Sequence, residues 1–168
     1  FSPKKILPLH LKMSFEEKIS YAKTVYGEKE LNAVIQCLKE STQKGKYTRF
    51  FEKKIADLFD KKYCLYVNSG SSALLLGLEA MDFPKGSEII TPALTFSTTV
   101  ASIIKNGLVP SFVDVSPNTF CIDCNKIEEM ISKKTVAILA PNLIGNLCDW
   151  AQIKQIANKH KLKVIEDS

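Results

Sequence analysis

Apolar side chains recur every three to four positions in two early stretches of the chain, residues 27–41 and 48–60. This spacing matches the turn of an α-helix, so each stretch predicts a helix with one apolar face. The faces consist of Leu31, Val34, Ile35 and Leu38 in the first helix and of Phe51, Ile55, Leu58 and Phe59 in the second. A turn near Gly45 separates the two helices, and an aperiodic arm up to about Ser14 precedes them.

From residue 63 onward, short apolar runs alternate with longer amphipathic segments. The short runs predict strands and the amphipathic segments predict helices. The predicted strands are 63–67, 87–92, 109–115, 135–141 and 163–167, and the predicted helices are 72–81, 95–106, 125–132 and 150–160. Alternating strands and helices, with strands apolar on both faces, indicate an α/β fold whose mainly parallel sheet is covered by helices on both sides.

In such sheets, ligands bind beyond the carboxyl ends of the strands. The turn 68–72, with the sequence NSGSS, follows the first predicted strand and opens a helix. A helix N-terminus holds phosphate well, Gly70 lets the backbone approach closely, and Ser71 and Ser72 add hydroxyl donors. The same residue types also serve as plain helix caps, so both interpretations stay open. The turn has neither the lysine of a Walker A motif nor the spacing of a dinucleotide fingerprint.

Three further candidate residues follow predicted strands. Phe96 is placed to cover a flat heterocycle, although a phenylalanine at such a junction is often a core residue. Asn142 follows another strand, where a turn asparagine is the simpler explanation. Asp167 ends the last strand, and a buried carboxylate is costly unless it is paired. An acid in line with a phosphate-binding turn suits pyridoxal phosphate (PLP), whose ring nitrogen needs such a partner, while a capping acid is the alternative.

Composition and charge narrow the classes of function. The chain has 168 residues, 45% of them apolar and 24% charged, as is usual for one globular domain. Its net charge of +5 comes almost wholly from scattered lysines, and Arg49 is the sole arginine. Proteins that read bases rely on arginine, so we expect no nucleic-acid partner.

The five cysteines are scattered and odd in number, which indicates reduced thiols and a cytoplasmic protein. Cys121 and Cys124 form a CxxC pair without further ligands at suitable spacing, so no metal site is expected. No apolar run approaches the roughly 20 residues of a membrane helix, and no signal-peptide pattern opens the chain. We therefore expect no membrane association.

Taken in order, the motifs resemble the DegT family of nucleotide-sugar aminotransferases, PLP-dependent proteins of fold type I. The resemblance lies in KGKYTRFFEKKIADLFDKKYCLYVNSGSSAL, GSEIITPALTFSTTVASIIKNGLVPSFVDV, APNLIGNLCDW and HKLKVIEDS. It implies the three-layer sandwich of the fold type I large domain. It also implies that Gly70, Ser71 and Ser72 hold the cofactor phosphate, that Phe96 stacks on the ring, and that Asp167 binds the ring nitrogen.

The chain departs from the family pattern in two places. Asn142 stands where many members have histidine, and its contact with the cofactor is inferred from position. Gly145 and Asn146 resemble a related branch of 3-dehydratases, which replaces the Schiff-base lysine by histidine; that deciding position lies beyond Ser168. The resemblance therefore implies an N-terminal arm and helix at 1–44, the N-terminal part of the PLP-binding large domain at 45–168, and a C-terminal domain that is absent.

The resemblance implies amino transfer, usually from glutamate, to a nucleotide-linked keto sugar in cell-surface polysaccharide or deoxysugar biosynthesis. The alternatives are 3-dehydration of a 4-keto-6-deoxy sugar nucleotide and a non-catalytic fragment. Fold type I active sites lie between subunits, so a homodimer is expected. The chain as given is expected to be inactive, because none of its lysines occupies the position of the Schiff-base lysine.

Overall fold

The computed structural model describes residues 22–40 and 43–168, and the predicted arm lies outside these ranges. The chain divides into two compact units, Phe1–Cys64 and Leu65–Ser168. The predicted domain boundary after residue 44 concerns the organisation of the family's large domain and stays a prediction. Each unit is described by itself.

The first unit contains both predicted helices, α1 (Glu28–Glu40) and α2 (Lys46–Leu58). The charges at the ends of α1 interact favourably with the helix dipole, with Glu28 and Glu30 in the first turn and Lys39 in the last. The two helices are confirmed, but their apolar faces are largely uncovered among the described residues. Leu38 is 62% exposed and Leu58 is 74% exposed.

A polar cluster lies at the turn between α1 and α2. Glu40 forms an ion pair with Lys46 and accepts hydrogen bonds from Gln36 Nε2 (2.7 Å) and Tyr47 Oη (3.0 Å). The hydrogen bond with Lys46, followed by those with Gln36 and Tyr47, lowers the pKa of Glu40 to about 2. This cluster links the end of one helix to the start of the next.

The second unit is an α/β sandwich around a four-stranded parallel sheet of order β2-β1-β3-β4. Its strands are β1 (Glu88–Pro92), β2 (Val109–Val113), β3 (Thr135–Pro141) and β4 (Lys163–Asp167). Its helices are α3 (Gly70–Ala80), α4 (Ser97–Lys105) and α5 (Trp150–His160), with short 3₁₀ turns η1 (Cys124–Lys126), η2 (Glu128–Met130) and η3 (Leu143–Gly145). The predicted fold class is confirmed.

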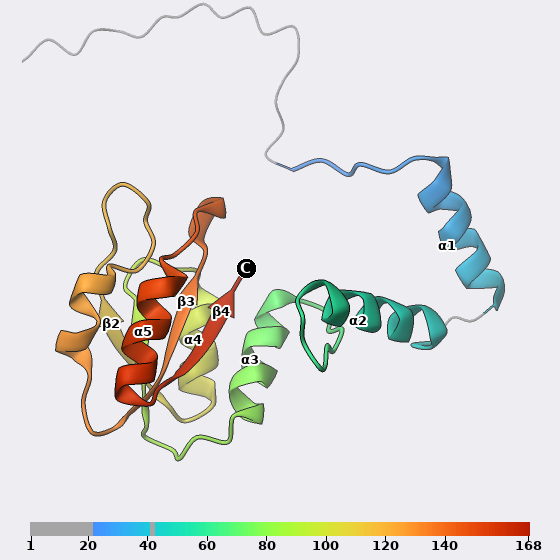
Figure 1. Ribbon diagram of the computed structural model, residues 1–168. Helices are drawn as coiled ribbons and strands as arrows, with labels where there is room; N and C mark the ends of the chain where they lie inside the picture. Colours follow the sequence, from blue (N-terminus) through green and yellow to red (C-terminus); the bar gives the residue numbers. More distant parts are fainter. Residues whose placement is uncertain (1–21, 41–42) are drawn as a thin grey trace, which may run out of the picture. The chain divides into compact units, whose positions relative to one another are not determined.

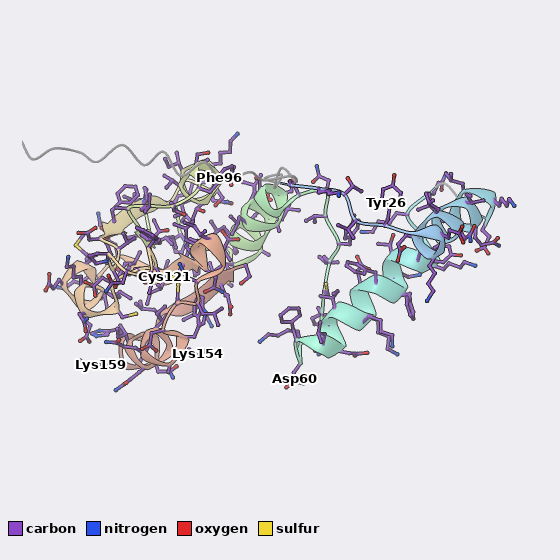
Figure 2. All side chains as sticks on the ribbon, turned by 90° about the horizontal axis from the view of Figure 1, so that it is seen from above. Tyr26, Asp60, Phe96, Cys121, Lys154 and Lys159 are labelled. Atoms are coloured by element: carbon purple, nitrogen blue, oxygen red, sulfur yellow. The ribbon has the colours of Figure 1, made fainter. Side chains whose placement is uncertain are left out.

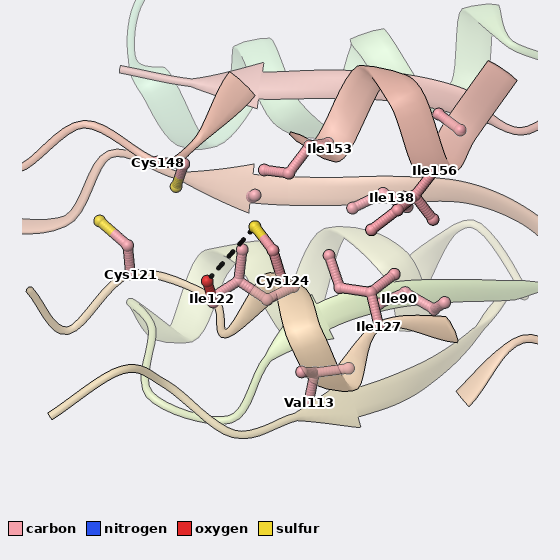
Figure 3. Close-up of a cluster of buried hydrophobic side chains, with 12 residues drawn as sticks. Ile90, Val113, Cys121, Ile122, Cys124, Ile127, Ile138, Cys148, Ile153 and Ile156 are labelled. Carbon is pink, nitrogen blue, oxygen red and sulfur yellow. Dashed lines mark hydrogen bonds between the residues drawn. The ribbon is translucent and has the colours of Figure 1, made fainter. Parts of the chain in front are cut away.

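Each face of the sheet carries its own hydrophobic cluster, because successive strand residues point to opposite sides. Ile89 and Leu139 pack with Leu78 of α3 and Ile103 of α4. We call this side the α3/α4 face. The other side, the α5 face, packs against α5 and the η1–η2 segment through Ile90, Ile127, Ile138, Ile153 and their neighbours (Figure 3). Sheet and covering helices therefore form three layers (Figure 1).

Helix α3 is the most apolar of these helices, and its leucines lie on more than one side. Leu78 is buried at 2% exposure, whereas Leu76 is 48% exposed. Within the part of the chain that the structure describes, neither α3 nor any other helix has the length and apolar character needed to cross a membrane.

Two predicted elements differ from the structure in type, and a third ends early. Residues 63–67, predicted as a strand, are irregular, and Leu65 is 80% exposed. Their apolar residues favour a strand, but a strand forms only where a neighbour completes its hydrogen bonds, and this segment pairs with neither edge of the sheet. The predicted helix 125–132 consists of the two 3₁₀ turns η1 and η2. The strand predicted to reach residue 115 ends at Val113.

Candidate functional site

Asp167 lies on the α3/α4 face of the sheet. In the parallel register of β3 and β4, Ile165 pairs with Leu139 and Asp167 with Pro141. Ile165 packs against the α3/α4 cluster, and the side chain two residues later leaves the strand on the same side. Asp167 therefore points toward the layer formed by α3 and α4.

The first turn of α3 reaches the same edge of the sheet. Helices α3 and α4 each run back from the carboxyl edge to the start of the following strand, so both begin at that edge (Figure 1). Ser71 and Ser72 of α3 line a hollow of about 170 Å³ together with Thr98, near the start of α4. The starts of α3 and α4 and the end of β4 thus share one edge and one face.

Gly70, Ser71 and Ser72 are the first three residues of α3, and Ser69 is the N-cap. The Ser72 N–H donates to Ser69 Oγ at 3.2 Å, whereas the N–H groups of Gly70 and Ser71 have no partner within the described residues. A Cβ added at Gly70 would meet no atom within 4 Å, so packing within the chain does not require glycine there. The open turn, with free N–H groups and two hydroxyls, has the donors that an anion needs.

The sequence analysis kept helix capping by this turn as an alternative, but it began the helix at Ser72 rather than at Gly70 and did not single out Ser69 as the cap. Serine immediately before the first helical residue is a common N-cap, and this signal was present at Ser69. Since Ser69 already binds the Ser72 N–H, an anion at this turn would meet chiefly the N–H groups of Gly70 and Ser71 and the serine hydroxyls.

Phe96 is the N-cap residue of α4, and the residue is 68% exposed. The alternative expectation, a core phenylalanine, therefore does not hold within the described residues. Thr95 Oγ1 donates to Thr99 Oγ1 at 3.0 Å and links the turn to the first turn of the helix. In Figure 2, Phe96 lies on the opposite side of the unit from Lys154 and Lys159 of α5. Its ring is thus available on the same side of the sheet as Asp167.

Asp167 is half-buried, and burial raises the pKa of its carboxyl group. Its backbone oxygen accepts a hydrogen bond from the Asn142 N–H at 2.8 Å, but its carboxylate has no hydrogen bond or ion pair among the described residues. A cation near this carboxylate would favour its charged form and offset the cost of burial. The carboxylate of Asp167 could therefore bind a positively charged ligand.

Asn142 is the centre of a polar network on the α5 face. Its Nδ2 donates to Glu166 Oε1 at 3.0 Å and to Ser168 Oγ at 2.8 Å. Its Oδ1 accepts from the Cys148 N–H at 3.0 Å and from Trp150 Nε1 at 3.1 Å. Both amide protons and both lone pairs of the side chain are thereby used. The predicted contact of Asn142 with a cofactor stays a prediction, and it would require the amide to exchange one of these bonds.

The thiols of Cys121, Cys124 and Cys148 are buried together on the α5 face (Figure 3). Burial, followed by nearby carboxylates, raises the pKa of Cys124 to about 11. Burial and a hydrogen bond with Cys121 raise the pKa of Cys148 to about 12. Among the described residues, no cluster of histidine, cysteine and acidic side chains suits a metal ion. The CxxC pair belongs to the hydrophobic core of the unit.

Comparison with known proteins identifies the family of the chain. Residues 25–168 match the model of the DegT/DnrJ/EryC1/StrS aminotransferase family. Among similar curated proteins is 3-oxo-glucose-6-phosphate:glutamate aminotransferase of Bacillus subtilis (strain 168), which is 41% identical over 144 residues. That match covers 83% of the chain but 33% of the enzyme, so the chain spans about a third of this relative's length.

Two solved structures resemble the chain closely. One is a GDP-4-keto-6-deoxymannose-3-dehydratase with a trapped PLP-glutamate geminal diamine, with a TM-score of 0.85, 33% identity, and coverage of 90% of the chain and 41% of that protein. The other is NtdA of Bacillus subtilis with bound cofactor PMP, with a TM-score of 0.79, 37% identity, and coverage of 90% and 37%. The family resemblance inferred from the motifs is confirmed, and the chain belongs to the DegT/DnrJ/EryC1/StrS aminotransferase family.

Proposed function

We propose that the protein containing this chain is a PLP-dependent aminotransferase acting on a nucleotide-linked keto sugar, in the biosynthesis of cell-surface polysaccharides or deoxysugars. The observation that carries the proposal is the half-buried carboxylate of Asp167, which lacks a partner among the described residues and faces the α3/α4 layer. An acid in this state is stabilised by a ligand with a protonated ring nitrogen. Family membership supports the identity of that ligand.

The first turn of α3 would hold the cofactor phosphate. The free N–H groups of Gly70 and Ser71 and the hydroxyls of Ser71 and Ser72 supply donors, and the positive end of the helix dipole favours the negative charge. The open space around Gly70 supports this assignment, because an anion needs close approach to the backbone there. Ser69, which caps the helix, keeps the turn in a helical conformation.

Phe96 and Asp167 would hold the ring. The exposed ring of Phe96 offers a flat surface, and Asp167 would keep the ring nitrogen protonated. When bound, the cofactor supplies an electron sink for charge that develops at the substrate carbon. The part of Asp167 in catalysis is to hold that proton. Asn142 lies at the same edge of the sheet, and its cofactor contact is proposed from position alone.

Glutamate is the proposed amino donor, and a sugar nucleotide is the proposed acceptor. The name of the Bacillus subtilis relative contains glutamate and an oxo-sugar phosphate, and the trapped adduct of the dehydratase contains glutamate. A second candidate reaction is 3-dehydration of a 4-keto-6-deoxy sugar nucleotide. Gly145 and Asn146 favour it, together with the likeness to the dehydratase structure. A lysine at the Schiff-base position beyond Ser168 supports amino transfer, and a histidine there supports dehydration.

The proposed assembly is a cytoplasmic homodimer, with residues 1–44 as an arm and helix and residues 45–168 as part of the PLP-binding domain. The exposed apolar faces of α1 and α2 support further burial in a larger assembly. Sedimentation of the protein that contains this chain tests the dimer at micromolar concentration. The isolated chain is proposed to be inactive, and catalytic turnover with glutamate and a 4-keto sugar nucleotide would contradict this.

Titration with PLP tests the cofactor site directly. The titration is followed by absorbance for the unmodified chain, for Asp167→Asn and for the matched control Glu166→Gln. A charge-assisted hydrogen bond is worth roughly 1.5–3 kcal/mol, so Asp167→Asn should weaken binding about tenfold or more. Glu166→Gln, one residue away on the other face, should have little effect. Equal affinities for all three chains would overturn the role of Asp167.

A further inference from the structure

The amide of Asn142 holds the end of β4 from the face opposite to Asp167. Its Nδ2 bonds Glu166 Oε1 and Ser168 Oγ, the two residues that flank Asp167 in sequence. Its backbone N–H bonds the Asp167 carbonyl oxygen at 2.8 Å and extends the ladder between β3 and β4 by one residue. Asn142, the residue that follows β3, therefore bonds three consecutive residues at the end of β4.

The other half of the same amide fixes the segment that leads into α5. Asn142 Oδ1 accepts from the Cys148 N–H and from Trp150 Nε1, and Trp150 packs against the hydrophobic cluster of the α5 face. The end of β4 is thus connected through one side chain to the packed core. Nothing else among the described side chains bonds both the end of β4 and the start of α5.

Strand geometry explains why this matters for the site. Glu166 and Asp167 are both acids, and a slip of one residue in β4 would exchange the faces on which they lie. The hydrogen bonds of Asn142 require Glu166 and Ser168 on the α5 face, which leaves Asp167 on the α3/α4 face. We propose that Asn142 is a positioning residue that locks the register of β4 and so determines which of the two acids faces the cofactor site. This inference rests on the proposed function for the role of Asp167.

The test exploits the chemistry of the Asn142–Glu166 pair. Asn142→Asp keeps an oxygen acceptor for Cys148 and Trp150 but loses the donor to Glu166 and Ser168 and places two carboxylates together. Adding Glu166→Gln to this variant exchanges donor and acceptor between the two positions and restores the bond. Trp150 is the sole tryptophan of the sequence, so its fluorescence reports whether the start of α5 is intact. Glu166→Gln alone is the matched control, because its side-chain oxygen still accepts from Asn142.

Two measurements are made on all four chains: hydrogen exchange at residue 142 and residues 163–168, and titration with PLP. For Asn142→Asp we expect faster exchange at these positions and roughly tenfold weaker PLP binding, from the loss of one to two hydrogen bonds, with unchanged Trp150 fluorescence. The double variant should recover both properties.

Hydrogen exchange that is unchanged in Asn142→Asp would contradict the proposal that Asn142 fixes the register of β4. Exchange that does not recover in the double variant, while Trp150 fluorescence is normal, would contradict it too. Faster exchange with unaltered PLP affinity would overturn the positioning role. If the unmodified chain does not bind PLP, the proposed function fails, whereas the exchange measurements still decide whether Asn142 fixes β4.

Discussion

Glu166 and Asp167 are neighbours in β4, yet their carboxylates have opposite surroundings. Glu166 is exposed on the α5 face and accepts a 3.0 Å hydrogen bond from Asn142 Nδ2. Asp167 is half-buried on the α3/α4 face, and its carboxylate has no partner among the described residues. One acid therefore has a hydrogen-bond partner within the chain, while burial disfavours the charged form of the other.

Asp167→Asn should stabilise the chain in the absence of a cofactor. Burial raises the pKa of Asp167, so the folded state disfavours its charged form, and this cost is present above the pKa range of carboxyl groups and vanishes below it. Since the group is still partly solvated, the gain at pH 7 should be at most about 1 kcal/mol in the free energy of unfolding. Urea unfolding at pH 7 and pH 3 measures it.

The difference between Asp167→Asn and the unmodified chain should shrink at pH 3, where the carboxyl group is largely neutral in both states. Glu166→Gln serves as the control and should not gain stability. A less stable Asp167→Asn at pH 7 would mean that the carboxylate has a stabilising partner within the chain.

Local patterns were sufficient to predict most elements of the second unit. Strand β3 is apolar from Val136 to Pro141, and α5 begins after Asp149, whose carboxylate accepts from the Gln152 N–H at 2.9 Å, so both are encoded within a few residues. The segment 63–67 has the same apolar character, but a strand also needs a neighbour at the right distance, which no local pattern records. Its prediction therefore failed.

The candidate site was predictable to a similar degree. The residue types of Gly70, Ser71 and Asp167 indicated an anion site and an unpaired acid, because both depend on the ends of single elements. The network of Asn142 was not predictable, since it joins residues 24 and 26 positions apart and depends on the register of β3 and β4. The sequence alone does not distinguish an asparagine that only forms a turn from one whose side chain joins several hydrogen-bond partners.

The buried thiols should resist alkylation and lower the stability of the chain at high pH. The pKa of Cys124 is about 11 and that of Cys148 about 12, so in the folded state both stay protonated at neutral pH. A thiol in the unfolded chain ionises near pH 8.5, whereas these two stay protonated in the folded chain to higher pH. The thiols therefore leave the free energy of unfolding unchanged below about pH 8.5 and lower it progressively as the pH rises toward 11–12. Iodoacetamide labelling with mass spectrometry measures the rates.

At pH 8, Cys124 and Cys148 should be labelled much more slowly in the folded chain than in urea. Cys64, which is less buried, provides an internal comparison within the same sample. Rapid labelling of Cys148 in the folded chain would show that its segment opens readily and would contradict its place in the core.

Glu128→Gln should weaken the attachment of η2 to α5. Glu128 Oε1 lies 2.8 Å from Lys159 Nζ and 2.6 Å from His160 Nε2, and its bonds with these groups lower its pKa. A lowered carboxylate pKa stabilises the fold above the ordinary pKa of glutamate, and this contribution is lost as the pH falls through the folded value. The variant should therefore unfold at lower urea than the unmodified chain at pH 7, with the gap closing in acid.

Glu129→Gln, at the adjacent position in η2, is the control for that measurement. Added salt should reduce the effect of Glu128→Gln, because Glu128 and Lys159 are solvent-exposed and His160 is partly exposed. A gap that persists unchanged at pH 2 would assign the effect to packing rather than to charge.

Thr91→Val should stabilise the second unit. Thr91 is fully buried in β1, and its Oγ1 has no hydrogen-bond partner among the described residues. A buried hydroxyl without a partner loses its hydration without compensation, and valine has nearly the same shape without the polar group. The free energy of unfolding should rise by about 1 kcal/mol.

Thr99→Val is the matched control, since Thr99 is equally buried but accepts a 3.0 Å hydrogen bond from Thr95. That variant should lose about 1 kcal/mol, because the Thr95 hydroxyl is left without its acceptor. Chemical unfolding of both variants gives the comparison, and a destabilised Thr91→Val would show that the Thr91 hydroxyl has a partner in solution, such as a buried water.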